Sequence, residues 1–560
     1  MTIPAFGHYQ TLKGIVLALA ARGHNVTLLG CEATGKDMAA DSLLGVLGAH
    51  GGRVSFLSLG ACPSYAGREA ALGALIAGAP GGVARVLEGI RELSQDMCRS
   101  AMAYYGADPR GRLPGALVFD ADTYCAMDVS VRWRVPRVAR VGTGLRDAFT
   151  TPLSVPAFST GLPLAMDLSQ RLTNWATLLA SRALIAPLLL PWLYSGHRAE
   201  WLLLGGGEGG VARHRPTSPL GVALNEASMA PNLLWDGVPT LYNSHWGLEH
   251  ARPLAPYEHL IGHTNDFLGD ASRPLEGALG SWLSHWGGGT ENGTSASAEA
   301  VVYVGMGTLG VLPRASVSRL AGALGACPRA RFVWSVPLSQ QGLLPEALMQ
   351  ASEAAHCYFG GREAGCAAEG GDRARVLLVP WAPQQAILVH PSVAAFVTHG
   401  GMNGMAEGLF ARLPLLCVPL FADQPDNCAH AVDKGYAARL SLAELTEEAF
   451  CGALGGLLEG QEVPRIRAAL QDAWVRNVAA GGAARAVAIV EAAAALPYGS
   501  HLGEVPREFF LPWYQRTGAD VGLVVLLVLL AALGSCVQCY RRLCQGCCRG
   551  SEAMGKVKGL

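Results

Sequence analysis

Short apolar runs alternate with amphipathic stretches along most of the chain. Before residue 285, runs of strand length are separated by segments of helical spacing, such as residues 12–22, and the same alternation returns after residue 300. Strands that alternate with helices are typical of βαβ units with a parallel sheet. The pattern predicts an α/β protein with strands at residues 25–30, 54–59, 116–121, 137–142, 300–307, 331–336, 375–382, 393–401 and 413–420.

A polar stretch separates the two series of strands. Residues 287–300 read GGGTENGTSASAEA, and Gly, Ser and Thr without large apolar residues are typical of a linker. We predict one Rossmann-like domain over residues 1–285, a linker over 286–300 and a second Rossmann-like domain over 301–500. Ligands of such sheets bind beyond the carboxyl ends of the strands, so a cleft between the two facing domains is the expected site.

The region between residues 150 and 235 has a different pattern, helical and strongly apolar. Its run at 178–194, LLASRALIAPLLLPWLY, is interrupted by two prolines. Two interpretations stay open. One is a packed helical insert, which we favour, and the other is a second contact with a membrane.

Twenty uncharged residues at 521–540 are long enough to cross a bilayer, because about 20 helical residues span its hydrocarbon core. Arg541 and Arg542 follow at once, and positive flanks favour the cytoplasm. We predict a juxtamembrane segment over 501–520, a transmembrane helix over 521–540 and a cytoplasmic basic tail over 541–560. The rest of the chain would lie across the membrane. Residues 1–8 lack the charged and apolar regions of an export signal. Either the coding sequence begins further upstream, which we favour, or the protein inserts into the membrane by its tail after synthesis.

Composition excludes several classes of protein. Half of the residues are hydrophobic and 16% are charged, which excludes a disordered chain. The net charge of −1 gives no electrostatic footprint for nucleic acid. Five of the 15 cysteines crowd the C-terminus, where two C-x-x-C pairs, 536–539 and 544–547, adjoin the membrane-like run, and a zinc site is not expected there. Palmitoylation next to the membrane and thiols without a role are the two interpretations of Cys536, Cys539, Cys544, Cys547 and Cys548.

Residues 381–430 carry the densest candidate chemistry. The run VAAFVTHGGMNG is a buried strand that enters a glycine turn and then a helix. A helix N-terminus that glycines allow a ligand to approach suits a diphosphate. Aromatic, amide and carboxylate side chains nearby offer a face for a planar base and partners for hydroxyl groups. The ligand implied, with base, diol, phosphates and polyol, is a nucleotide sugar.

This segment resembles the donor-binding signature of the UDP-glycosyltransferases, glycosyltransferase family 1, through WAPQ, HPSV, FVTHGGMNG and PLFADQPDNCAH. The resemblance implies a GT-B fold, two facing Rossmann-like domains, with the acceptor bound by the first domain and the UDP-sugar by the second. The animal-type members add a C-terminal transmembrane helix. The donor-binding residues implied are Thr308, Trp381, Gln384, His399, Gly401, Asn403, Gly404, Glu407, Asp423 and Gln424.

The resemblance also implies a role for each side chain. Trp381 would stack on uracil, Gln384 and Glu407 would hold the ribose, and Asp423 and Gln424 would hold the sugar.

The resemblance implies that four residues of this chain hold the diphosphate. They are His399, Asn403, the backbone of Gly404 and Thr308, which sits where the family has a phosphate-contacting Ser or Thr. The chain departs from the family at 305 and 306, where Gly and Met replace the commoner Ser and Phe or Leu.

The first residues match the family more loosely, through GHYQTLKGIVLALAARGHNVTLL. The match implies that His8 is the general base that takes the acceptor's hydroxyl proton, a task that suits a neutral imidazole with pKa about 6.5. An Asp orients this histidine in the family. Asp120 and Asp122 are both candidates, and the family spacing before a Cys favours Asp120. His24 is interpreted as structural.

The triplet at 120–122 also resembles the metal-binding DxD of another glycosyltransferase fold. The surrounding pattern is that of the metal-independent type, so we expect no metal and no cofactor besides the UDP-sugar co-substrate.

The reaction implied is transfer of a hexose, glucose or glucuronate, to a hydroxyl of a small lipophilic acceptor with inversion. We expect the protein to lie in the endoplasmic reticulum membrane, with one transmembrane span and a luminal catalytic domain. Two alternatives remain: a nucleotide-sugar 2-epimerase on a similar fold, and a membrane protein that binds UDP-sugar without turnover.

Overall fold

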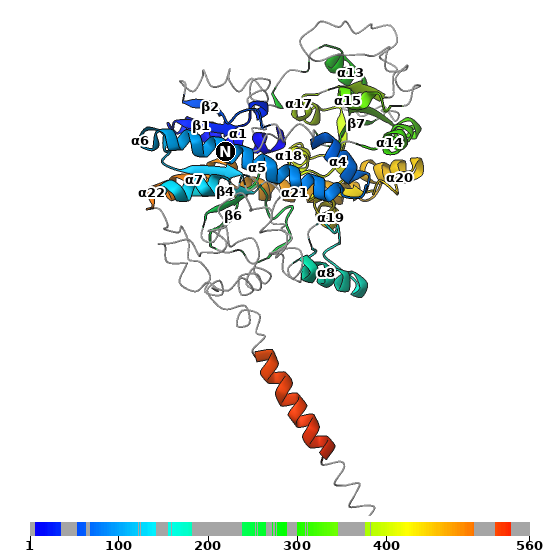
Figure 1. The fold of residues 1–560 in the computed structure, drawn as a ribbon. Coiled ribbons are helices and arrows are strands. Elements are labelled where there is room, and N and C mark those ends of the chain that lie inside the picture. Colours follow the sequence, from blue (N-terminus) through cyan, green and yellow to red (C-terminus); the bar gives the residue numbers. More distant parts are fainter. Residues whose placement is uncertain are drawn as a thin grey trace, which may run out of the picture.

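The computed structural model describes residues 6–34, 53–62, 68–120, 123, 125–141, 155–157, 159–181, 238–252, 254, 256–264, 271–272, 275, 277–287, 300–307, 310, 312–344, 376–380, 382–497 and 521–538. Two lobes lie side by side, and a single long helix extends away from them (Figure 1). Most blue and cyan elements of the first half are drawn in one lobe, whereas the blue α4 (Arg68–Ile76) and the teal α8 (Leu168–Ala180) are drawn with the yellow elements of the second half at the other lobe.

The N-terminal half contains two parallel sheets among its described residues. Strands β1 (Val26–Gly30) and β2 (Val54–Ser58) pair with each other. The second sheet has the order β3 (Leu117–Asp120), β4 (Arg137–Val141), β5 (Thr240–Tyr242) and β6 (Glu258–Leu260). Strands of three residues are too short to show a period, which is why β5 and β6 were not predicted. The helices of this half are α1 (Phe6–Ala21), α4 (Arg68–Ile76), α5 (Gly82–Ala107), α6 (Pro109–Arg112), α7 (Cys125–Trp133), α8 (Leu168–Ala180) and α13 (Gly277–Gly287).

The described residues of the C-terminal half form a six-stranded parallel sheet with the order β12-β11-β10-β7-β8-β9. Its central strand β7 (Ala300–Gly305) reads AVVYVG, and all but its first residue are buried, as expected for a strand covered by helices on both faces. The other strands are β8 (Ala330–Ser335), β9 (Val376–Val379), β10 (Val393–Thr398), β11 (Leu415–Cys417) and β12 (Ala437–Arg439). The helices are α14 (Arg314–Ala326), α15 (Leu338–Gln341), α17 (Gln384–Leu388), α18 (Met402–Phe410), α19 (Gln424–Asp433), α20 (Glu447–Leu458), α21 (Val463–Ala480) and α22 (Gly482–Ala495).

The strand order of this sheet reverses between β7 and β10. The chain runs outward from β7 through β8 to β9, then returns to the other side of β7 and continues from β10 to β12. A ligand of an open parallel sheet binds at such a switch point, beyond the carboxyl ends of the strands. The loops that follow β7 and β10 are therefore the expected binding loops.

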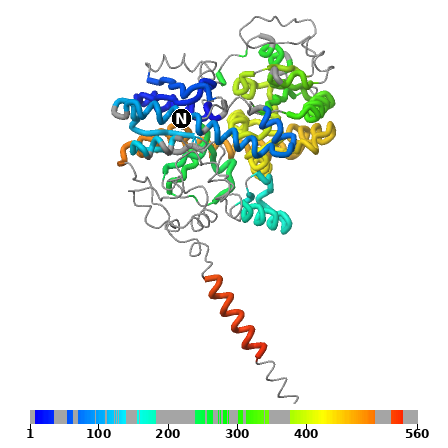
Figure 2. The backbone as a smooth tube through the Cα atoms, in the orientation of Figure 1, coloured from blue at the N-terminus to red at the C-terminus, as the bar shows by residue number. Residues whose placement is uncertain are grey.

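The last helix of the body returns to the first half. Helix α21 ends at Gly481, whose φ of 95° breaks the helix, and α22 then packs against α1 and β4. Val487, Ile489 and Val490 share a core cluster with Leu12 and Ile15 of α1. Figure 2 shows this orange segment among the blue and cyan elements.

Two disulfides join cysteines of the described residues, one within each half. Cys31 and Cys62 join the loops after β1 and β2, with a Cα–Cα distance of 5.8 Å. Cys327 at the end of α14 and Cys451 of α20 are 5.4 Å apart. The spacing of the cysteines along the chain predicts neither pair.

Two described stretches are long and apolar enough to cross a membrane. The first, Val463–Ala495, comprises α21 and α22 and belongs to the body, because α22 buries residues in the core just described. The second, Val521–Gln538, has a mean hydropathy of 2.5, and none of it is buried. This helix is the candidate span that the sequence predicts, and residues 539–540 of that prediction lie outside the described residues.

Candidate functional site

His8 and Asp120 meet although 112 residues separate them in the chain. His8 lies in the first turn of α1, and Asp120 is the last residue of β3, at the carboxyl end of that strand. The Nδ1 atom of His8 is 2.5 Å from Oδ2 of Asp120. The carboxylate is fully buried, whereas the histidine side chain is 24% exposed. Asp122, the other candidate, lies outside the described residues.

This geometry fits an imidazole held in one tautomer. A buried carboxylate that accepts a hydrogen bond from Nδ1 orients the ring and stabilises the imidazolium when Nε2 takes a proton. Helix α1 begins at Phe6, earlier than the helix predicted over residues 12–22, so His8 belongs to the helix rather than to a loop before it. A position in a helix restricts the side chain more than a loop would.

The switch point of the second sheet encloses His399. This residue follows β10, and Gly307, which follows β7, has a φ of +77°. A Cβ atom on Gly307 would lie 2.5 Å from Nε2 of His399, and a Cβ on Gly401 would also collide with that nitrogen. The glycines at 307 and 401 therefore allow the loop after β7 and the loop after β10 to lie close to the imidazole.

The environment of His399 keeps its ring neutral. The residue is partly exposed by surface area, yet its ring is enclosed by the glycine loops, and burial lowers its pKa to about 4. A neutral imidazole still offers one N–H to a phosphate oxygen, with a fixed direction and no charge to desolvate.

Helix α18 begins immediately after this loop. Gly401 is its N-cap and makes no side-chain cap hydrogen bond, and Asn403 and Gly404 occupy the first turn. First-turn N–H groups have no partner within a helix and carry the positive end of its dipole. The resulting arrangement of a strand end, a glycine turn and a helix N-terminus can bind an anion.

Glu407 of α18 is held by two glutamines of α17. The Nε2 atom of Gln384 donates to one carboxylate oxygen of Glu407, and Nε2 of Gln385 donates to the other at 3.0 Å. A Cβ on Gly305 would lie 2.7 Å from Oε1 of Gln384, so the departure from Ser at 305 leaves room for this rotamer. Gln384 and Glu407, which the resemblance assigns to the ribose, are therefore hydrogen-bonded to each other. Gln385 was not among the predicted residues.

Asp423 ends the loop after β11, and Gln424 is the first residue of α19. Both side chains are buried, and Oε1 of Gln424 accepts hydrogen bonds from the backbone of Leu420 at 2.9 Å and Phe421 at 3.1 Å. The preceding residue, Ala422, has a φ of +55°, a conformation that costs a non-glycine residue free energy and is often found at functional sites.

Asn427 connects this loop to the His399 loop. Its Nδ2 donates to Oδ2 of Asp423 at 2.7 Å and to the carbonyl of Gly400 at 2.8 Å. The predicted residues at 399–407 and at 423–424 therefore belong to one connected site. Asn427 was not among the predicted residues, although it lies in the same PLFADQPDNCAH motif, four residues after Asp423.

Two predicted donor residues cannot be placed. Thr308 and Trp381 lie outside the described residues, although their neighbours Gly307 and Ala382 are described.

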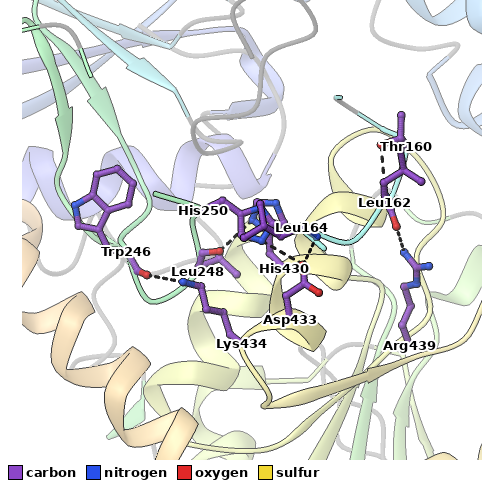
Figure 3. A network of polar contacts seen from close by, with 11 residues as sticks. Thr160, Leu162, Leu164, Trp246, Leu248, His250, His430, Asp433, Lys434 and Arg439 are labelled. Atoms are coloured by element: carbon purple, nitrogen blue, oxygen red, sulfur yellow. Dashed lines mark hydrogen bonds and ion pairs between the residues drawn. The ribbon is translucent and has the colours of Figure 1, made fainter. Parts of the chain in front are cut away.

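Helix α19 joins the site to the N-terminal half. Asp426 accepts hydrogen bonds from the backbone N–H groups of Ser159 and Gly161, at 2.5 Å and 2.8 Å. Further along, the network in Figure 3 continues the junction, with Asp433 accepting from the backbone of Leu164 at 2.8 Å.

Three more contacts from this end of α19 reach the loop after β5. Lys434 donates to the carbonyl of Trp246 at 3.2 Å, and His430 Nδ1 lies 3.1 Å from the carbonyl of Leu248 (Figure 3). The ring of His250 stacks on that of His430 at 3.5 Å between centroids. None of these junction residues was predicted, because contacts between side chains and distant backbone groups leave no local pattern.

The sequence profile of the UDP-glucoronosyl and UDP-glucosyl transferase family matches residues 244–550, more than half of the chain. The chain belongs to this family. The matched region contains every donor-side residue discussed above, and the His8–Asp120 pair precedes it.

Individual members of the family resemble the chain over a shorter stretch. The chain is 33% identical to UDP-glucuronosyltransferase 2B1 of Rattus norvegicus over 185 residues, which are 32% of this chain and 33% of that protein. It is 32% identical to anthocyanidin 3-O-glucosyltransferase of Zea mays over 222 residues, 40% of each chain. The match thus spans between a third and two fifths of the length of these relatives.

Solved structures resemble the whole body. UGT2 of Phytolacca americana, solved with UDP-2fluoro-glucose and pterostilbene, has a TM-score of 0.53 and 18% identity, covering 88% of this chain and 99% of that one. The glycotransferase of kitacinnamycin has a TM-score of 0.51 and 19% identity, covering 88% and 98%. This likeness confirms the prediction of a GT-B fold with two Rossmann-like domains.

Proposed function

We propose that the chain transfers a hexose from a UDP-sugar to a hydroxyl group of a small lipophilic acceptor, with inversion at the anomeric carbon. The observation that supports this most directly is the 2.5 Å contact between His8 and the buried Asp120. A binding module needs no such pair, whereas a transferase needs a base for the acceptor's proton.

In the proposed reaction, Nε2 of His8 takes the hydroxyl proton while the acceptor oxygen attacks the anomeric carbon. The bond from that carbon to the diphosphate breaks as the new bond forms, so UDP leaves from the opposite face. Asp120 stabilises the imidazolium that results. The N-terminus of α18 and the neutral His399 stabilise the charge on the departing diphosphate, without a metal or further cofactor.

For both the sugar and the acceptor we propose a chemical class and not an individual compound. Glucose and glucuronate are both proposed donors, since the relatives are named for glucuronosyl and glucosyl transfer. Asp423 and Gln424 would bind the sugar hydroxyls, and Glu407 with Gln384 would bind the ribose. Thr308 and Trp381 are proposed for the phosphate and the uracil.

We also propose that the helix Val521–Gln538 anchors the protein in the endoplasmic reticulum membrane as a single span, with the body in the lumen. The two disulfides support a luminal body, because disulfides persist in oxidising compartments and are rare in the cytosol. The basic tail predicted for residues 541–560 would then be cytoplasmic.

The test is UDP release by the full chain reconstituted in phosphatidylcholine vesicles. UDP-glucose and UDP-glucuronate are each offered with a panel of phenols and sterols, and His8→Ala is compared with His24→Ala. His24 is a matched control, because it is an exposed histidine 2.9 Å from Glu491 of α22. We expect acceptor-dependent release that falls about 10²–10⁴-fold in His8→Ala, the usual contribution of a general base, and is unchanged in His24→Ala.

Other outcomes select the alternatives. UDP release that requires no acceptor indicates an epimerase. UDP binding without release from any donor indicates a binding protein without turnover. Release that His8→Ala leaves unchanged contradicts the assignment of the base and leaves only the donor site.

A further inference from the structure

The connection between α1 and β1 carries a motif that the proposed function does not use. Residues 25–27 read Asn-Val-Thr, and in the pattern Asn-X-Ser/Thr the asparagine is an acceptor for an N-linked glycan. The apolar pattern predicts a strand over residues 25–30, which would include this asparagine. In the structure β1 begins one residue later, at Val26, so Asn25 lies in the connection and is exposed.

The turn that places Asn25 outside the strand is well defined. The backbone N–H at Gly23 donates to the carbonyl of Ala20 at 2.9 Å, and that of His24 donates to the carbonyl of Leu19 at 3.2 Å. Gly23 has a φ of 97°, the left-handed conformation in which many helices end. The end of α1 is therefore fixed by its own hydrogen bonds, and the exposure of Asn25 follows from it.

Both side chains that define the motif are accessible. The Asn25 amide makes no hydrogen bond with another residue in the described ranges, so its nitrogen is available for reaction. Thr27 is exposed on β1, and its hydroxyl lies 3.1 Å from that of Ser55 on β2. Burial along the strand begins at Leu28. An acceptor asparagine is expected at such a surface position.

The surface next to Asn25 is hydrophilic. Arg22 and His24, which lie just before it, pair with Glu491 of α22 at 3.0 Å and 2.9 Å. The side chains of both basic residues are about half exposed. A glycan is bulky and soluble and is carried on surfaces, so it suits polar surroundings of this kind.

Asn25 is also remote from the proposed catalytic base. His8 lies in the first turn of α1, whereas Asn25 follows the last turn of the same helix. Helix α1 has 16 residues, which at about 1.5 Å per residue make it about 24 Å long. A glycan attached at Asn25 therefore starts at the opposite end of α1 from His8.

The chemistry of the same segment fits the compartment in which N-glycans are attached. Cys31 follows β1 directly and forms a disulfide with Cys62. Disulfides form and persist in the lumen of the endoplasmic reticulum, and the acceptor motif is used in proteins that enter this lumen. Residues 25–31 thus carry two independent features of a luminal chain.

We propose that Asn25 carries an N-linked glycan. The inference rests on the luminal body proposed above. In the modification, the amide nitrogen of Asn25 bonds to C1 of an oligosaccharide that is carried on a lipid diphosphate. The bond from C1 to the diphosphate breaks, the diphosphate leaves with the bonding electrons, and the amide loses one proton. The lipid-linked oligosaccharide and its transferase belong to the lumen.

The test expresses the full chain behind a cleavable signal peptide in cultured animal cells. An amidase that releases N-glycans converts the asparagine that carried one to aspartate, and in heavy-oxygen water this residue is labelled for peptide mass spectrometry. We expect most copies of the chain to be labelled at residue 25. Asn25→Gln should lose this label and migrate faster on a gel by one glycan.

Thr27 supplies the matched controls. Thr27→Val keeps the shape of the side chain without its hydroxyl, so the label at residue 25 should disappear although Asn25 is unchanged. Thr27→Ser restores the hydroxyl and should restore the label. A label that persists in Thr27→Val overturns the proposal, because it would not come from the motif.

Two further measurements keep the inference separate from the proposals on which it rests. Residues 292–294 form the second such motif of the chain, so Asn292→Gln is used to show that the remaining gel shift comes from Asn25. UDP release should be equal in wild type and Asn25→Gln. A label at residue 25 with no UDP release in any variant supports the glycan and contradicts the transferase.

Protease added to sealed microsomes reports on which side of the membrane the body lies. A protected body labelled at residue 25 supports the proposal. A protected body without label at residue 25 overturns the proposal and leaves the luminal body standing. A body that the protease digests overturns both.

Discussion

The two halves of the molecule build their polar sites in different ways. In the C-terminal half, residues 399–407 and 423–427 come from two consecutive βα loops of one sheet, tied together by Asn427. In the N-terminal half, the pair of His8 and Asp120 joins a helix and a strand that are 112 residues apart. The first site depends on local loop geometry, and the second depends on how the whole half folds.

This difference has a chemical counterpart. A diphosphate is recognised mainly by backbone N–H groups and close approach, so glycines and a helix N-terminus suffice and can be written in one short segment. Proton transfer needs two side chains at hydrogen-bond distance, and any part of the fold can supply them. The donor site is therefore compact in sequence, and the proposed base is not.

The most severe test of this comparison is Asp120→Asn. The amide keeps the shape of the side chain but cannot stabilise an imidazolium, so kcat should fall about 10³-fold or more, as in other His–Asp pairs. Affinity for UDP should not change, because Asp120 belongs to the other half. Steady-state kinetics and calorimetric titration with UDP measure the two quantities.

Asp108→Asn is the matched control, because Asp108 caps α6 through its side chain and Asn caps a helix equally well. Wild-type kinetics in Asp120→Asn, or an equal loss of UDP affinity, would contradict the separation of the two sites.

A smaller effect is expected from Gly401→Ala. The backbone of Gly401 has ordinary angles, φ −65° and ψ 142°, so alanine adds no backbone strain. Its Cβ would collide with Nε2 of His399, which Gly307 prevents from moving aside. We expect UDP to bind roughly tenfold more weakly, about 1.4 kcal/mol, with kcat reduced less than in Asp120→Asn.

Gly452→Ala serves as the control for this change, since nothing lies within 4 Å of a Cβ at that position in α20. It should leave binding unchanged and stabilise the helix slightly. Equal UDP affinities for both variants would show that the close approach to His399 is not needed.

The last effect expected is a gradual loss of stability in acid. Each half buries a neutral histidine: burial lowers the pKa of His263 to about 3 and that of His399 to about 4. Unfolding restores a pKa of about 6.5, so the unfolded chain binds more protons below that pH. Stability is full above pH about 6.5 and falls by up to about 1.4 kcal/mol per pH unit and per histidine as the pH drops toward the folded pKa values.

Urea unfolding at a series of pH values from about 7.5 to about 5 measures this loss, because the range begins above the unfolded histidine pKa of about 6.5 and ends below it. His263→Gln and His399→Gln should each flatten the profile. A midpoint that does not depend on pH would mean that neither ring is kept neutral by burial.

Much of the fold could be predicted because the strands of parallel sheets are buried on both faces. Runs such as AVVYVG and VAAFVT show as continuous apolar segments, and they form β7 and β10 at the positions expected. Short strands such as β5 and β12 carry three residues each and have no such signal. The packing of α22 against the first half could not be predicted either, because the apolar face of a helix does not indicate which sheet it covers.

The candidate site shows the same difference between features with a local sequence pattern and features without one. The candidate donor-binding residues were predicted from the motifs of residues 381–430, and their role stays a prediction. The structure adds hydrogen-bond partners of these side chains, such as Gln385 and Asn427, which lie four residues away or on an adjacent helix. The choice between Asp120 and Asp122 needed a resemblance, because the pairing with His8 is a property of the folded chain. The junction at Asp426 and Asp433 uses backbone groups of distant residues, which sequence patterns do not encode.

The path of α22 bears on how the protein is made. The core around α1, β4 and β5 includes Val487 and Val490, so it lacks part of its packing until the ribosome has passed residue 490. The half that is synthesised first is therefore completed last, after the whole six-stranded sheet has emerged. A fragment that ends at the linker before β7 would expose the apolar faces of Leu12 and Ile15, and it would depend on chaperones or on the missing helix supplied as a separate peptide.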